Sequence, residues 1–203
     1  GVQTCALPIF ATHHLERGRG RYWAAQALAR GGDPAAAVAG WQRLVTELPL
    51  TWYALLAESR LRERGAEVSA LPEPPPRRPT PAVEIPPKVR WLAALGFDHE
   101  AGAALHADEE RLRRELPAGR ADEALAQAYL TVGEARRSFL LSSRHAEALD
   151  PLPTPDTRWV WDCGFPRPHA ELVAAAEDAH EMPRNYLFAI MRQESGFNTR
   201  DVS

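Results

Sequence analysis

The sequence predicts an all-α protein. Apolar residues recur three and four positions apart through much of the chain, the spacing of one helix face. Glycines, prolines and capping residues divide these stretches into segments of helical length. The 203 residues are 45% apolar and 25% charged, with a net charge of −3, enough for one or two hydrophobic cores. This balance gives no basic surface typical of nucleic-acid binding, and no stretch has the length and apolarity of a membrane span.

The first ten residues are expected to be non-native. Residues 1–10 lack the basic start and the long apolar run of a secretory signal, and they resemble translated sequencing adapter. Residues 11–70 then predict stacked helical hairpins of tetratricopeptide-like type. A Gly-Gly pair closes one helix, and Asp33 caps the next with Pro34 in its first turn.

Two helix faces follow from the spacing in residues 11–70. Their members are Val38, Trp41, Val45 and Leu48, then Trp52, Leu55, Leu56 and Ser59. Aromatic residues here could stack on sugar rings, but large rings at helical spacing more often fill the seams between helices. We therefore expect the aromatic residues to be buried: Tyr22, Trp23, Trp41, Trp52 and Tyr53.

Proline divides the rest of the chain. Residues 71–87 contain eight prolines, which exclude helix and predict an extended linker. Residues 88–150 predict a helical linker domain, in which the charged run Glu109–Glu115 is expected to be a solvated face with i,i+4 ion pairs. Residues 151–168, again rich in proline, predict a connector.

The segment 169–203 carries the chemistry. Leu172, Ala175, Ala176 and Ala179 predict one helix there, and a second, of about three turns, is predicted between Pro183 and Gly196. Glu194 shares a stripe with the apolar residues of the second helix, so we expect it to face a core or cleft, where burial and the negative helix end would raise its pKa. A protonated carboxylic acid can cleave a glycosidic bond. Alternatively, Glu194 is a boundary residue whose head reaches water.

The run Met191-Arg-Gln-Glu-Ser-Gly-Phe-Asn198 resembles the first catalytic motif of the soluble lytic murein transglycosylases, whose catalytic domain is similar to goose-type lysozyme. Residues Phe165-Pro-Arg-Pro-His-Ala-Glu-Leu-Val173 are similar to the segment that enters this domain. The resemblance implies a superhelical platform of helical hairpins followed by the first helices of a lysozyme-like domain. It also implies that the chain is a C-terminally truncated, inactive piece of a longer enzyme.

The resemblance implies a reaction that is not hydrolysis. Glu194 would be the single acid and base that cleaves the β-1,4 bond between N-acetylmuramic acid and N-acetylglucosamine, giving a 1,6-anhydro product. Ser203 matches a serine close to the bound sugar. Ser195 is also assigned to the substrate-binding residues, although its main expected role is to support the helix end. No cofactor is implied. The partners would be peptidoglycan glycan strands and other cell-wall enzymes, in the periplasm or cell envelope.

Two other functions fit the same sequence. A helical-repeat adaptor that binds proteins explains residues 20–150 equally well, and a lysozyme-like hydrolase would use the same Glu194. A metal site is not expected, because the histidines are scattered and none has zinc-ligand spacing. A disulfide is not expected either, since Cys5 and Cys163 lie far apart and one is in the doubtful first segment.

Overall fold

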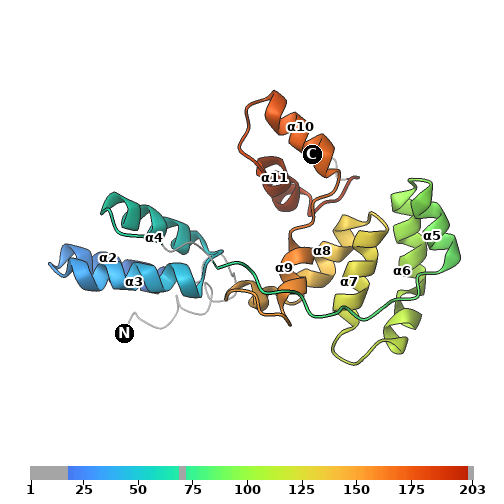
Figure 1. Cartoon of the computed structure of the whole chain (residues 1–203), viewed down its shortest axis with the longest axis horizontal. Helices are drawn as coiled ribbons and strands as arrows, with labels where there is room; N and C mark the ends of the chain where they lie inside the picture. The colour runs from blue at the N-terminus through green and yellow to red at the C-terminus, as the bar shows by residue number, and fades with distance from the viewer. Residues whose placement is uncertain (1–17, 69–71, 201–203) are drawn as a thin grey trace, which may run out of the picture. The chain divides into compact units, whose positions relative to one another are not determined.

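The protein is all-α. A computed structural model describes residues 18–68 and 72–200 (Figure 1). Over these residues the chain forms ten α-helices, one 3₁₀ helix (Ala146–Leu149) and no strand, which confirms the predicted fold class. None of the described helices has the length and apolarity needed to cross a membrane. The chain divides into two compact units, Gly1–Pro76 with Ala146–Pro155 (the first unit) and Arg77–His145 with Asp156–Ser203 (the second unit).

Three helices build the first unit: α2 (Arg19–Arg30), α3 (Pro34–Glu47) and α4 (Trp52–Glu63). The side chain of Asp33 caps α3 and that of Thr51 caps α4, each by accepting a backbone N–H from the first turn. α3 packs against both α2 and α4. The predicted hairpins and the Asp33 cap are confirmed, whereas the tetratricopeptide-like superhelix stays a prediction.

The aromatic residues of the first unit do not all fill seams. Tyr22, Trp41 and Tyr53 are buried as expected, but Trp23 is 51% exposed and Trp52 is 54% exposed. The predicted face of α4 was therefore right only for Leu56, which packs against the core. Trp52, Leu55 and Ser59 are exposed, because the helix is rotated so that the positions after the predicted stripe face the core. The buried residues of α4 are Tyr53, Ala54, Ala57 and Leu61.

Seven helices belong to the second unit. They are α5 (Pro87–Ala94), α6 (Asp98–Glu115), α7 (Ala121–Thr131), α8 (Ala135–Ser143), α9 (Arg158–Gly164), α10 (Ala170–Ala179) and α11 (Tyr186–Glu194). Residues 72–86 form no helix, which confirms the extended connection. Part of this connection is fastened to the second unit, where Arg78 contacts Glu123 at 2.8 Å and Asp156 at 2.7 Å.

The predicted connector 151–168 contains a helix, α9, that was not expected there. The high proline content of this stretch argued against a helix, but the seven residues of α9 contain no proline. α9 buries Trp159, Val160 and Cys163 and packs on α7 and α8. This segment is therefore part of the core of the second unit.

Candidate functional site

The motif helix α11 is held at its start by a buried carboxylate. Glu177 of α10 is 2% exposed and accepts hydrogen bonds from the backbone N–H groups of Asn185 and Leu187, both at 3.0 Å. A negative side chain is favourable at a helix N-terminus, where the first N–H groups have no partner within the helix. The helix predicted from the spacing of Leu172, Ala175, Ala176 and Ala179 is present as α10, with Leu172 72% exposed.

The end of α11 is also tied down. Gly196, at φ +54, reverses the chain after the helix, and the Phe197 N–H donates to the Met191 carbonyl at 3.2 Å. The Ser195 hydroxyl donates to the same carbonyl at 3.0 Å, as expected of a residue that supports the helix end. From α8, Arg136 donates to the Ser195 carbonyl at 2.8 Å. α11 is shorter than predicted, with nine residues from Tyr186 instead of a first turn at Pro183.

A second arginine, Arg192, holds the side of α11 against α8 and the end of α9. The Arg192 guanidinium lies over two aromatic rings, 5.1 Å from the centre of Phe139 and 4.6 Å from that of Phe165. Its Nε donates to the Gly164 carbonyl at 3.0 Å. Stacking of this kind holds an arginine without a carboxylate partner. The motif residue Arg192 thus serves packing between α8, α9 and α11.

Glu194 does not face the core. It is exposed, and Ile190 on the same predicted stripe is 41% exposed, whereas α11 buries Phe188. The expectation of a buried Glu194 was therefore wrong, since the helix is rotated toward Phe188 and Arg192. Among the described residues Glu194 forms no hydrogen bond or ion pair, so its carboxylate is open to a ligand. Ser203 lies outside the described residues.

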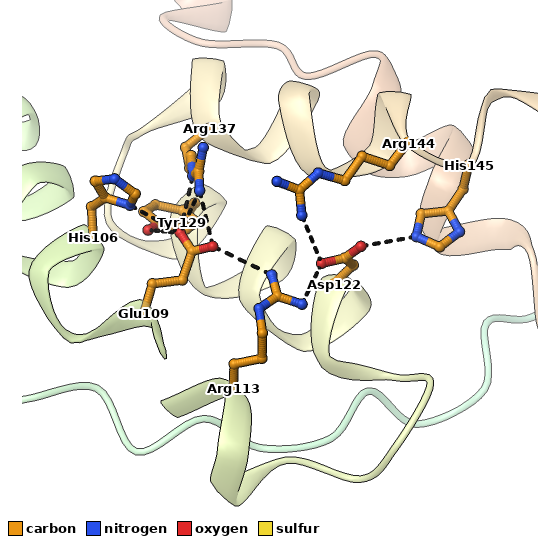
Figure 2. Close-up of polar contacts among 8 residues, drawn as sticks. All are labelled: His106, Glu109, Arg113, Asp122, Tyr129, Arg137, Arg144 and His145. Carbon is orange, nitrogen blue, oxygen red and sulfur yellow. Dashed lines mark hydrogen bonds and ion pairs between the residues drawn. The ribbon is translucent and has the colours of Figure 1, made fainter. Parts of the chain in front are cut away.

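A charged cluster in the second unit spans α6, α7 and α8 (Figure 2). Glu109 is 3% exposed and accepts a hydrogen bond from the Tyr129 hydroxyl at 2.7 Å. Arg137 binds both its oxygens, at 2.9 and 3.0 Å, and the Arg113 guanidinium lies 3.3 Å away. Burial alone would raise the pKa of Glu109, but hydrogen bonds from Tyr129, His106 and Arg137 outweigh it and lower the pKa to about 2.

The cluster continues through Arg113 to a second acid. Arg113 binds Asp122 at 2.7 Å, and the Asp122 carboxylate also contacts His145 at 3.0 Å (Figure 2). Burial opposes ionisation of Asp122, yet the bonds to His145 and Arg113 lower its pKa. The expectation that Glu109 lies on a solvated face was wrong. A signal was present, because Glu109 falls on the helical stripe of the buried Leu105 and Leu112.

A pocket of about 570 Å³ lies beside the motif in the second unit. Its walls come from α6, Tyr129 of α7, the turn before α8, α8 itself, the segment before α10, Met191 of α11 and the residues that follow Glu194. Those residues are Ser195, Phe197, Asn198 and Thr199. Glu194 itself is not part of the lining, although Ser195 next to it is. No sequence pattern predicts this pocket, since its walls lie up to about a hundred positions apart in the chain.

Three histidines that the sequence scatters line the same pocket: His99, His106 and His169. In the described part of the chain, no group of three or more histidine, cysteine or acidic side chains is placed to hold an ion. Cys163, the cysteine within that part, is buried and unpaired. Burial raises the pKa of its thiol to about 11, which disfavours the reactive thiolate at neutral pH.

Comparison of the chain with protein families, curated proteins and solved structures finds no match.

Proposed function

We propose that the chain carries the acid and base of a lytic transglycosylase that acts on peptidoglycan. The motif Met191–Asn198 supports this proposal, and one structural observation carries it: the Glu194 carboxylate is exposed and unpaired among the described residues, at the end of a helix that Glu177, Arg136 and Arg192 hold in place. An acid that must meet a substrate oxygen needs such a fixed backbone and an open carboxylate.

The reaction needs one carboxyl group. Glu194, protonated, donates its proton to the glycosidic oxygen as the bond from this oxygen to the muramic C1 breaks. The C6 hydroxyl of the same muramic acid then bonds to C1, and its proton passes to the Glu194 carboxylate. The products are a 1,6-anhydromuramic end and a free 4-hydroxyl on the N-acetylglucosamine. The substrate supplies the nucleophile, so a second carboxylate is not required, unlike in most glycosidases.

The test is product analysis by mass spectrometry. Purified peptidoglycan is digested with the product of the complete open reading frame that encodes these residues, and with its Glu194→Gln variant. The matched control is Glu171→Gln, which changes an exposed glutamate on α10. We expect anhydro-muropeptides from the unchanged protein and the control, and none from Glu194→Gln. The 203-residue chain, assayed in parallel, is expected to be inactive.

The other outcomes separate the competing functions. Reducing-end muropeptides would show a hydrolase that uses the same Glu194. No release by any of the proteins would refute the enzyme and favour the adaptor, for which the half-exposed Trp23, Trp52 and Leu55 of the first unit would be the first surface to test.

A further inference from the structure

The pocket beside α11 holds two opposite charges that have no ion-pair partner among the described residues. Glu134 and Arg136 both line it and both come from the start of α8. Glu134 precedes the first helical residue of α8 and contacts Gly102 of α6, whereas Arg136 contacts the Ser195 carbonyl, so the two side chains diverge. A third charged residue of the lining, Arg137, already forms an ion pair with the buried Glu109, which does not line the pocket.

The two free charges are fixed at different walls. Glu134 lies against α6, where a Cβ on Gly102 would come within 2.8 Å of its Cγ and of one of its carboxylate oxygens. Arg136 reaches the opposite way, to the Ser195 carbonyl after α11, and uses one of its five N–H donors there. The remaining donors of Arg136 are available to a ligand. An acceptor and a donor therefore stand on either side of the pocket.

The rest of the lining is suited to a small organic molecule. Leu140, Met191 and Ala103 add apolar surface between the charges. A volume of about 570 Å³ falls within the usual range of small-ligand pockets, which is about 300 to 1,000 Å³. A simple anion would satisfy Arg136 and leave Glu134 unpaired. A simple cation would do the reverse.

We propose that this pocket binds a short peptide through both charges, with an ammonium group at Glu134 and a carboxylate at Arg136. Carboxylates and guanidinium groups form strong charge-assisted hydrogen bonds, as do ammonium groups and carboxylates. The peptide has two chemical sources: a peptidoglycan stem peptide, with D-residues, or an ordinary L-peptide. Peptide binding does not depend on cleavage, so the proposal stands or falls separately from the role of Glu194.

The experiment is calorimetric titration of the 203-residue chain with matched peptides. The first series is L-trialanine with free ends, the same peptide with an acetylated N-terminus, and the same peptide with an amidated C-terminus. We expect saturable binding of the free peptide and about ten- to hundred-fold weaker binding of each blocked form, since each loses one charge-assisted contact. The second series replaces trialanine by the stem tetrapeptide L-Ala-γ-D-Glu-diaminopimelate-D-Ala. Tighter binding of the stem peptide assigns the peptidoglycan source, and tighter binding of trialanine the protein source.

Variants locate the contacts. Glu134→Gln should weaken the free peptide about ten-fold or more and leave the acetylated peptide unchanged, because the acetylated form has no ammonium to lose. Arg136→Gln should weaken binding of the free peptide by a similar factor and leave binding of the amidated peptide unchanged, because the amidated form has no carboxylate to lose. The control is Arg90→Gln, an exposed arginine of α5 outside the pocket. Ala103→Trp fills the pocket without removing a charge and should abolish binding.

Three outcomes would overturn the proposal. The first is the absence of saturable binding for every peptide at millimolar concentration. The second is equal affinity for the free and both blocked peptides. The third is wild-type affinity in Ala103→Trp, which would place any peptide elsewhere on the chain even if the Arg136 variant were poorly folded.

Discussion

Replacing Glu109 by glutamine tests the charged cluster of the second unit. The amide keeps the size of the side chain but removes the charge that Arg137 and Arg113 share. We expect the free energy of unfolding to fall by about 3 kcal/mol at pH 7. Folding lowers the pKa of Glu109 from 4.5 to about 2, and each pKa unit corresponds to about 1.4 kcal/mol of stability while the carboxylate is ionised. The direct cost of breaking a buried ion pair, about 3 to 5 kcal/mol, is of the same size.

The sign of the pH dependence follows from the lowered pKa. Stabilisation by Glu109 is fully present above pH 4.5 and is lost as the pH falls from 4.5 toward 2, since protonation of the folded form then removes the charge. The difference between the wild type and Glu109→Gln should therefore shrink to roughly 1.4 kcal/mol at pH 3.

The assay is urea unfolding, monitored by hydrogen exchange in peptides from α6 to α8. This readout reports on the second unit alone, which matters because a chain with two compact units need not unfold in one step. Glu110→Gln is the matched control, since Glu110 is the next residue on α6 and is exposed. An equal loss of stability in both variants, or a difference that does not shrink at pH 3, would refute the reasoning.

Three further predictions concern single residues of the second unit. Gly133→Ala should cost about 0.5 to 1.5 kcal/mol more than Gly119→Ala in urea unfolding, the cost of moving one side chain off its rotamer. Both glycines have positive φ, but a Cβ on Gly133 would meet the Asp98 carboxylate at 2.5 to 2.9 Å and one on Gly119 meets nothing. In a Cys5→Ser background Cys163 should resist thiol reagents at pH 8 until urea exposes it, because its pKa is raised to about 11; rapid labelling of the native protein would contradict this. Glu177→Gln should speed amide exchange at the start of α11 about five- to thirty-fold, from the loss of roughly 1 to 2 kcal/mol of capping, whereas Glu171→Gln should not; equal rates in the two variants would argue against the cap.

Local signals in the sequence were enough for the fold class and for several helix ends. Asp33 followed by Pro34 specifies a helix start within a few residues, and the structure confirms it. The buried face of each helix was harder to predict than its ends. In short helices such as α4 and α11, two neighbouring stripes are almost equally apolar, and packing against distant helices decides between them. This is why Phe188 is buried and Ile190 is not.

The site was only partly predictable for a related reason. The motif around Glu194 is contiguous and therefore visible in the sequence, but its supports come from elsewhere. Arg136, which binds the Ser195 carbonyl, lies 59 positions earlier, and nothing local to Arg136 indicates that contact. The pocket beside α11 likewise joins residues from α6, α8 and the end of α11. Contacts of this range depend on the tertiary fold, which periodicity does not specify.

The contacts of Arg78 bear on the order in which the second unit assembles. One guanidinium joins an extended segment to Glu123, 45 positions later, and to Asp156, 78 positions later. Contacts between residues this far apart form late, because the chain must first close a long loop. During synthesis, α5 to α8 would emerge with Arg78 paired to Glu123 but still without its second partner, Asp156. We therefore expect a nascent chain that stops before Asp156 to remain more sensitive to protease than one that extends past α9.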